Sequence, residues 1–270
     1  MPNQIGLAGC GRMGLPMLHA LRGAGFEATG FDVRPAADFG NDQPIMAFDA
    51  SAFATPLNIL FSVVRDIAQT DALLFEDQAI VKNAPDLTHI VICSTVSPNY
   101  ILALQNKLPK HITLIDAPMS GAAIAAQEKR LSFMIGGDDP EIMPVLPMIK
   151  AMAAHIHRMG PLGAGMAAKV LNNLVAASST ATTRLALDWA AEFGLAQQEM
   201  LDLMHVSSGQ TWFGSGFDNI EFARDGFATD NTIGILKKDV ESALDAAPNG
   251  ANTALPRALI NAITALRKID

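Results

Sequence analysis

The sequence has little cysteine and few aromatic residues. Its only cysteines, Cys10 and Cys93, lie in apolar, strand-like surroundings. This argues against a disulfide framework or a multi-cysteine metal site, and it favours a reducing, cytoplasmic setting. Although aromatic residues make up only 6% of the chain, half of the residues are apolar and 17% are charged. That balance is typical of ordinary globular proteins, so we expect real hydrophobic cores.

Long uninterrupted apolar runs are also absent. The longest candidate, residues 162–177, is broken by Lys169, Asn172 and Asn173, so it falls short of a helix that crosses a bilayer. No basic start with an apolar stretch and a small-residue cleavage site precedes the strand-like residues that begin at Ile5. We therefore expect a protein without an export signal or a membrane span.

Positive charge is in the minority. The formal net charge of −8 argues against a nucleic acid or an anionic membrane as the main partner, because either would favour clustered Lys and Arg. A small molecule is therefore the expected partner, with neither nucleic acid nor membrane. A chain of 270 residues is long enough for two domains.

Short β-like runs alternate with helical patterns over the first 160 residues. Because most of these runs are apolar throughout, they are typical of parallel strands covered on both faces by crossover helices. The sequence predicts a Rossmann-type α/β domain with a doubly wound, mostly parallel sheet. The expected strands lie in 5–9, 27–32, 58–64, 88–94, 113–119, 131–137 and 155–160.

After Gly160 the pattern becomes long and rich in Ala, Leu and Met, with no alternation of period two. We expect helices over 164–193, 195–206, 232–246 and 253–268, with a Gly- and Ser-rich loop at 207–216. The predicted domains are therefore a dinucleotide-binding domain at 1–162 and an all-α substrate and dimerisation domain at 163–270.

A glycine motif follows the first expected strand. Residues 9–14 read Gly-Cys-Gly-Arg-Met-Gly and precede an expected helix, and an acid, Asp32, closes the second strand. Here Gly9 permits a tight turn, Gly11 lets the backbone approach a pyrophosphate, and Gly14 lets the helix pack close to the strand. With this context the motif predicts dinucleotide binding, and we assign the contacts to Gly9, Gly11, Arg12, Met13, Gly14 and Asp32.

Asp32 also bears on the choice of cofactor. A carboxylate at this position accepts hydrogen bonds from the adenosine ribose and repels a 2′-phosphate, which favours NAD over NADP. Arg34 follows two residues later, and it could either reach a 2′-phosphate or remain a solvated loop residue. We expect NAD as the preferred cofactor, with NADP as the alternative.

Lys169 is the only charged residue between Arg158 and Arg184. A lysine in apolar surroundings is costly unless it meets an anion or loses its proton, and desolvation lowers its pKa towards values useful in proton transfer. Asn172 and Asn173 lie one helical turn later and share its face, so the three side chains can converge on one ligand. The alternative is that Lys169 extends to the surface while the asparagines bind backbone groups.

With these motifs in view, the chain resembles the β-hydroxyacid dehydrogenase family, whose members include 3-hydroxyisobutyrate dehydrogenases and tartronate semialdehyde reductases. The likeness covers almost the whole chain. Besides the glycine motif, the matching blocks are CSTVSP (93–98), DAPMSG (116–121), GAGMAAKVLNN (163–173) and LKKDV (236–240).

The resemblance implies a role for each matching position. Lys169 corresponds to the family's catalytic lysine, which would stabilise the substrate oxygen and exchange a proton with it during hydride transfer. The implied substrate-binding residues are Ser120, Gly121 and Asn173, and the implied further cofactor contacts are Val64, Arg65, Thr95 and Lys238. From the residues alone, Thr95 could instead cap the helix that begins near Pro98, and Lys237 and Lys238 could form a solvated helix face.

The chain also departs from the family pattern. Positions where the family has further glycines carry Ala122, Ala125 and Lys129. The Ala122 methyl group either narrows the space beside the substrate carboxylate or alters the turn. The chain ends at Asp270, where family members commonly extend for a few more turns, so we expect an unusual substrate pocket.

The sequence therefore predicts an enzyme that oxidises a small 3-hydroxy acid to its semialdehyde, or reverses that reaction, with NAD(P) and no metal. The long apolar helix expected from about Gly165 to Phe193 and the Ala- and Leu-rich helices after it have more apolar surface than a small domain hides, so we expect a homodimer or homotetramer. One alternative is an imine reductase-like NADPH enzyme, in which the catalytic lysine is generally replaced. The other is a catalytically silent dinucleotide-binding sensor, which would have no need of Lys169 or Ser120.

Overall fold

The computed structural model describes residues 3–269, and the chain divides into two compact units at Lys169/Val170. The first unit is an α/β structure and the second is helical. The expected fold class, a mostly parallel doubly wound sheet followed by an all-α region, is thus confirmed. No helix within residues 3–269 combines the length and the hydropathy that crossing a bilayer would require.

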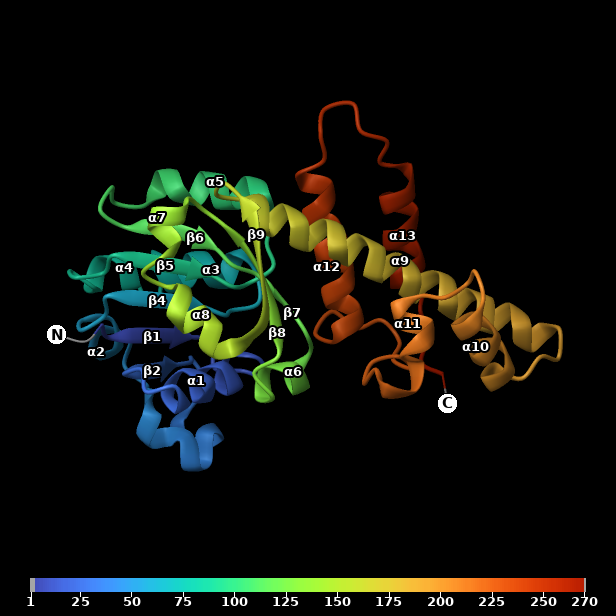
Figure 1. Cartoon of the computed structure of the whole chain (residues 1–270), viewed down its shortest axis with the longest axis horizontal. Helices are drawn as coiled ribbons and strands as arrows, with labels where there is room; N and C mark the ends of the chain where they lie inside the picture. The colour runs from blue at the N-terminus through green and yellow to red at the C-terminus, as the bar shows by residue number, and fades with distance from the viewer. Residues whose placement is uncertain (1–2, 270) are drawn as a thin grey trace. The chain divides into compact units, whose positions relative to one another are not determined.

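The sheet of the first unit has the strand order β3-β2-β1-β4-β5-β6-β8-β7, with β9 beside β8 (Figure 1). Pairing is parallel from β3 to β6, whereas β8 runs antiparallel to β6 and β7. The described strands are β1 (Ile5–Ala8), β2 (Ala28–Phe31), β3 (Met46–Ala47), β4 (Ile59–Ser62), β5 (His89–Ile92), β6 (Thr113–Asp116), β7 (Met119–Ser120), β8 (Leu131–Gly136) and β9 (Ala153–Gly160).

Each expected strand is present, whereas β3 and β7 were not expected from the sequence. Both have only two residues, so neither is long enough to show an alternating or continuous apolar pattern. β7 carries Ser120, and its pairing with β8 places Ser120 opposite Ser132.

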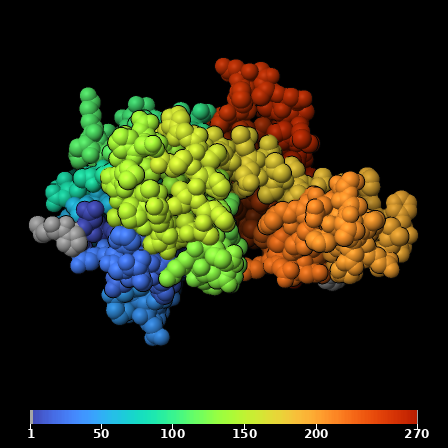
Figure 2. All heavy atoms as spheres, viewed as in Figure 1, coloured from blue at the N-terminus to red at the C-terminus, as the bar shows by residue number. Residues whose placement is uncertain are grey.

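Helices cover both faces of the sheet. One apolar core joins the sheet to α1 and α8, and a second joins its other face to α2, α3, α4 and α5. In Figure 2 the yellow-green segment from β7 to β9 forms the near face of this unit. The helices are α1 (Gly14–Gly23), η1 (Ala36–Ile45), α2 (Ala50–Ala54), α3 (Ile67–Leu74), α4 (Ile80–Asn83), α5 (Pro98–Lys107), α6 (Ala123–Gln127), α7 (Asp139–Ile142) and α8 (Leu146–Met152).

A single long helix, α9 (Ala164–Glu192), begins in the first unit and continues through the second. Within the second unit, α12 and α13 pack against each other (Figure 1) and share one apolar cluster with α9, while α10 and α11 share another. The remaining helices are α10 (Gln197–Val206), α11 (Trp212–Ser215), η2 (Phe217–Asn219), α12 (Thr232–Asp245) and α13 (Ala254–Thr264).

The four expected C-terminal helices are present, but the expectation of a loop over 207–216 was wrong in part. One helical turn, α11, forms there because Thr211 Oγ1 accepts the backbone N–H of Gly214 at 3.0 Å. Such an N-cap satisfies a donor that the helix start leaves open. Phe213 is fully buried and anchors the turn.

Candidate active site

The carboxyl ends of the parallel strands bring together the residues expected to bind the dinucleotide. The loop 9–13 follows β1, Asp32 follows β2, Val64 and Arg65 follow β4, and Thr95 follows β5. Since β2, β1, β4 and β5 are neighbours in this order, these residues lie in the same order along one edge. The edge includes the switch point between β1 and β4, where doubly wound sheets bind their ligands.

The glycine motif has the shape that a pyrophosphate needs. Gly9 has a φ of 91°, and a Cβ there would lie 2.7 Å from the backbone of Val63. A Cβ on Gly14 would lie 2.0 Å from the Gly9 carbonyl oxygen, whereas one on Gly11 would have no atom within 4 Å. Gly9 and Gly14 therefore build a tight turn, and Gly11 borders open space. No side chain caps the start of α1, which is the position that phosphates occupy on such helices.

Two buried hydroxyl groups near the same edge have no partner among the described residues. Ser62 ends β4, and Ser94 follows β5. The Oγ atom of each is inaccessible to solvent, and it neither donates nor accepts a hydrogen bond within residues 3–269. An unsatisfied buried hydroxyl costs about 1–3 kcal/mol. Both hydroxyl groups lie below the accessible surface, so the fit to a dinucleotide at this edge rests on the glycine turn and the uncapped start of α1.

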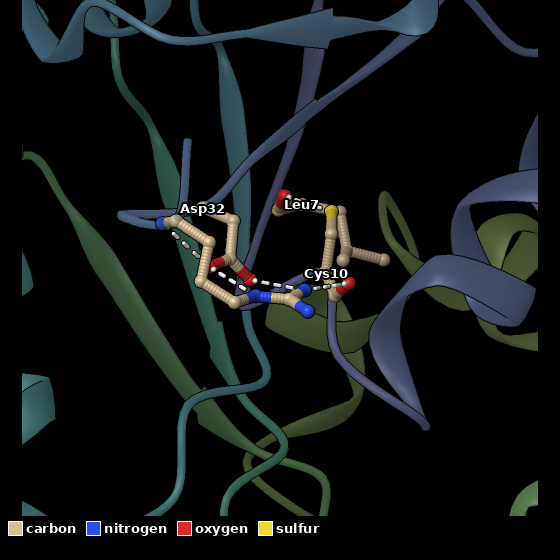
Figure 3. Close-up of polar contacts among 4 residues, drawn as sticks. Leu7, Cys10 and Asp32 are labelled. Atoms are coloured by element: carbon tan, nitrogen blue, oxygen red, sulfur yellow. Dashed lines mark hydrogen bonds and ion pairs between the residues drawn. The ribbon is translucent and has the colours of Figure 1, made fainter. Parts of the chain in front are cut away.

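Asp32 and Arg34 form an ion pair beside the glycine loop. Asp32 Oδ1 accepts the Nε–H of Arg34 at 3.1 Å, and the Arg34 guanidinium also donates to the Cys10 carbonyl at 2.8 Å. In Figure 3 dashed lines join this guanidinium to Asp32 on one side and to Cys10 on the other, and the Cys10 thiol faces Leu7. The ring of Phe39 lies 4.7 Å below the guanidinium. Arg34 is thus an exposed loop residue, with 45% of its side chain accessible, but its guanidinium is paired with Asp32, which raises the pKa of Arg34 through their hydrogen bond.

The thiol inside the glycine motif is chemically inert. Burial raises the pKa of Cys10 to about 12, and Cys93 is likewise buried, with its pKa raised by desolvation. Because the thiolate is the reactive form, neither side chain is a nucleophile near neutral pH. Both cysteines are free, and Cys10 donates to the Leu7 carbonyl.

The hydroxyl that caps α5 belongs to Ser97. Its Oγ accepts the N–H of Asn99 at 3.1 Å, and Pro98 occupies the first helical position. The interpretation of Thr95 as the cap was therefore wrong, because the helix begins two residues later than that role requires. Thr95 is half-buried at the edge of the sheet, between Ser94 and Val96.

Lys169 and Ser120 meet within the first unit. Lys169 Nζ donates to Ser120 Oγ at 3.0 Å, and only 7% of the lysine is exposed. The interpretation in which Lys169 extends to solvent was therefore wrong. An ammonium group has three N–H donors and no acceptor, so the hydroxyl proton of Ser120 remains available to a third group.

The segment after Ser120 accommodates its unusual residues. Gly121 has a φ of 127°, and Lys129 adopts a φ of 58°, the left-handed conformation that favours glycine. Lys129 thus adopts a backbone conformation that costs less for glycine, the residue that the resemblance led us to expect in this segment. Ala122 is exposed and Ala125 is buried against the core that contains Leu131.

A polar group of three residues lies in the second unit. Asn173 Nδ2 donates to Asp239 Oδ2 at 2.5 Å, and Lys238 Nζ pairs with Asp239 Oδ1 at 3.0 Å. The interpretation in which the asparagines bind only backbone groups was wrong, since Asn172 Nδ2 also donates to the side chain of Asn173. The approach of Asn173 and Lys238 to the cofactor edge stays a prediction.

Two family models match consecutive parts of the chain. Residues 4–160 match the NAD-binding domain of 6-phosphogluconate dehydrogenase, and residues 163–265 match the NAD-binding domain of NADP-dependent 3-hydroxyisobutyrate dehydrogenase. Together with the glycine turn and the lysine block, these matches decide the assignment. The chain belongs to the β-hydroxyacid dehydrogenase family.

Relatives of this family member agree with the assignment. It is 29% identical to an NAD-dependent L-serine dehydrogenase of Pseudomonas aeruginosa over 77% of this chain and 71% of the relative. It is 30% identical to a probable 3-hydroxyisobutyrate dehydrogenase of Mycobacterium bovis with the same two coverages. The solved 3-hydroxyisobutyrate dehydrogenase of Mycobacterium tuberculosis with L-serine superposes with a TM-score of 0.79 at 26% identity, over 97% of this chain and 92% of that one.

This β-hydroxyacid dehydrogenase is therefore an NAD(P)-dependent enzyme that acts on a hydroxyl group. Sequence reasoning singled out Lys238 in its LKKDV block but missed Asp239, which is buried and contacts both Lys238 and Asn173. A signal was present, because Asp239 lies three residues after Leu236 and so falls on the apolar face of α12. An acid at such a position needs a partner.

Proposed function

We propose that this enzyme interconverts a small 3-hydroxy acid and its semialdehyde, with Lys169 as the catalytic residue. The observation that carries the proposal is the buried contact between Lys169 Nζ and Ser120 Oγ at 3.0 Å. It supplies an amine that can exchange a proton and a hydroxyl within one site, at the end of a segment that the family uses for substrate binding. The relatives that act on L-serine and 3-hydroxyisobutyrate are consistent with this class of substrate.

The roles of the residues follow from their donors and acceptors. NAD(P)+, when bound, supplies the hydride acceptor for the alcohol carbon. In the oxidation, the Lys169 amine takes the hydroxyl proton at Nζ, and the resulting ammonium stabilises the oxygen by a hydrogen bond; in the reduction, it returns that proton. Ser120 donates a hydrogen bond from its hydroxyl to the substrate carboxylate, Gly121 adds a second from its backbone N–H, and Asn173 orients the substrate.

For the cofactor, we propose a preference for NAD over NADP. The Asp32 carboxylate is placed at the end of β2, where it can accept the ribose hydroxyl groups. The Arg34 guanidinium neutralises part of that charge in the ion pair at 3.1 Å, which weakens the exclusion of a 2′-phosphate. We therefore expect a preference for NAD that is smaller than an unpaired aspartate would give.

We also propose a functional division at residues 1–162 and 163–270, with the second part forming a homodimer or homotetramer. Exposed apolar side chains recur at helical spacing on one face of α9 and just past its end, and this stripe comprises Leu171, Val175, Leu185, Trp189 and Phe193. Trp189 is 62% exposed. Exposed apolar side chains gathered on one helix face favour a protein interface, and a second copy of the same chain offers a matching stripe.

The dimer is tested by substituting charge into the stripe. Val175→Glu and Trp189→Glu each bury a charge at the interface, so we expect the assembly to become monomeric in light scattering coupled to size-exclusion chromatography. Leu255→Glu is the matched control, because Leu255 is 70% exposed but lies on α13, outside the stripe. A wild-type chain that is already monomeric at micromolar concentration contradicts the proposal.

The reaction is tested by following nicotinamide absorbance over a panel of 3-hydroxy acids and semialdehydes, with Lys169→Ala in parallel. We expect Lys169→Ala to lower kcat by about 10²–10⁴-fold, the range for loss of general acid–base catalysis. The dissociation constant for NAD+, measured by calorimetry, should be unchanged in that variant and lower than the constant for NADP+. A Lys169→Ala variant with wild-type kcat on an active substrate would refute the catalytic assignment.

A further inference from the structure

Asp116 ends β6 and binds the first turn of the helix that carries Lys169. Its Oδ1 accepts the N–H of Gly163 at 2.7 Å and its Oδ2 accepts the N–H of Met166 at 2.6 Å. The side chain is fully buried. These are N–H groups that a helix start leaves without partners, and an anion there is favoured by the helix dipole.

The same turn is held closely on its other sides. A Cβ on Gly165 would lie 2.3 Å from the Met134 carbonyl oxygen and 3.0 Å from the Asp116 carbonyl oxygen. The backbone N–H of Val96 donates to Met166 Sδ at 3.4 Å. The start of α9 therefore rests on β6, on β8 and on the loop after β5, with no room for a side chain at position 165.

The segment that contains Asp116 also reaches the far end of the lysine side chain. Ser120 lies four residues after Asp116, and its Oγ accepts a hydrogen bond from Lys169 Nζ. One short segment thus fixes the backbone before Lys169 and the tip of Lys169 itself. A slip of α9 by one residue would turn Lys169 by about 100° and shift it by about 1.5 Å, which would break the contact with Ser120.

We propose that Asp116 is a positioning residue for Lys169. The Asp116 carboxylate sets the rotation of the first turn of α9 and how deeply that turn lies against the sheet. This inference rests on the proposed catalytic function of Lys169. Only a carboxylate offers an acceptor to each of the two N–H groups. An asparagine would present one oxygen and one NH2 group, and the latter would face an N–H donor.

The first experiment measures the placement of Lys169 without using activity. Wild type, Asp116→Asn and Ile149→Ala are treated with acetic anhydride, and acetylation of each lysine is followed by peptide mass spectrometry. Ile149 is buried on α8 away from α9, so this control loses core packing without touching the contact. Burial raises the pKa of Asp116, which means that desolvation disfavours its charged form. We therefore expect the fold to tolerate asparagine, which has nearly the same shape and no charge.

We expect Asp116→Asn to accelerate acetylation of Lys169 by about 10-fold, the factor that corresponds to one lost charge-assisted hydrogen bond. The exposed Lys82 and Lys110 are internal references whose rates should not change. Ile149→Ala should leave the Lys169 rate as in wild type. An unchanged Lys169 rate in folded Asp116→Asn overturns the proposal, as does an equal increase in the control.

The second experiment is a double-mutant cycle in kcat. A residue that acts through Lys169 matters only while Lys169 is present, so Asp116→Asn should lower kcat by about 10–100-fold alone and by less than about 3-fold on the Lys169→Ala background. Equal losses on both backgrounds overturn the proposal. If Lys169→Ala keeps full activity, the catalytic assignment fails, and the acetylation rates still decide whether Asp116 places the lysine.

If Asp116→Asn does not fold, Gly165→Ala provides a second test, in which the acetylation rate of Lys169 is measured after the first turn of α9 is displaced. Alanine ordinarily stabilises a helix interior by about 1 kcal/mol relative to glycine, but here its Cβ would push the first turn away from Met134 and Asp116. We expect faster acetylation of Lys169 in this variant too. A Lys169 rate equal to that of wild type would contradict positioning by close contact of this turn.

Discussion

Two buried charges bind backbone groups, one in each unit. In the first unit, Asp116 accepts N–H groups from Gly163 and Met166. In the second, the Arg184 guanidinium, only 2% exposed, donates to the carbonyl oxygens of Ala223 at 2.7 Å and Asp225 at 2.9 Å, and also to that of Arg267. Both residues therefore place a full charge where an ordinary core would have an apolar side chain.

The two charged side chains differ in the kind of backbone groups that they bind. Asp116 satisfies donors at a helix start, and that helix carries a catalytic candidate one turn later. Arg184 satisfies acceptors in irregular segments near 223–225 and 267, which have no ladder or helix to pair with. A buried carboxylate thus sets the register of a regular element, whereas a buried guanidinium with several donors substitutes for regular structure.

Removing the guanidinium should give the largest effect on stability. Arg184→Met keeps an apolar stem but removes the donor from three carbonyl groups, one buried and two partly buried, so we expect a loss of about 3–5 kcal/mol in the free energy of unfolding. Urea denaturation followed by circular dichroism measures it. Arg184→Lys should recover only part of the loss, because an ammonium lacks the planar fork. A loss below about 1 kcal/mol in Arg184→Met would contradict this role.

The cap of α5 by Ser97 is a local counterpart of the contact between Asp116 and the start of α9, and its removal should cost less stability. Ser97 caps α5 from the adjacent residue in the chain, whereas Asp116 binds α9 from 47 residues away. Ser97→Ala should therefore cost about 1 kcal/mol in unfolding free energy and leave the acetylation rate of Lys169 unchanged. A change in that rate would mean that α5 and α9 are coupled more tightly than the contacts indicate.

The smallest expected effect is a pH trend that only one of the two charges can show. Burial raises the pKa of Asp116 above its ordinary value of 3.8, so the native state binds this proton more tightly than the unfolded chain does. The contribution of Asp116 is therefore most favourable below pH 3.8 and declines as the pH rises through the native pKa. Burial lowers the pKa of Arg184, but a guanidinium stays protonated in this range.

This trend is measured as the difference in unfolding free energy between wild type and Asp116→Asn, taken from about pH 4 to pH 7. As the pH rises, the difference should shift in favour of the variant. The same difference for Arg184→Met should stay constant over that range. A shift in the opposite direction for Asp116 would mean that its N–H partners outweigh its desolvation.

Much of the fold could be predicted because most strands are continuous apolar runs and the main C-terminal helices, such as α9 and α12, are long. Buried runs such as 59–62 and 89–92 leave few alternatives once crossover helices separate them. The two-residue strands β3 and β7 could not be predicted, since their pairing depends on neighbouring strands. The helical turn α11 was missed because its Gly- and Ser-rich sequence favours a loop until Phe213 finds a buried site.

In the candidate site, too, residues in a local motif could be predicted, whereas contacts between residues far apart in the sequence could not. Gly9, Gly14 and Asp32 could be read from a local motif, because strand, turn and helix are contiguous there. The partners of the polar residues could not, since Lys169 and Ser120 lie 49 residues apart and Asn173 and Asp239 lie 66 apart. The competition between Ser97 and Thr95 for the cap was settled by where α5 begins.

By itself the sequence determined the family, the dinucleotide motif, the class of reaction and the identity of the unusual lysine, because each depends on residue types at fixed local spacing. Only the tertiary structure decided that Arg34 pairs with Asp32, that Lys169 meets Ser120, and that Asp116 binds the first turn of α9. Hydrogen bonds act over about 3 Å, and which groups come within that distance depends on how β6, β7 and α9 pack, which no local pattern encodes.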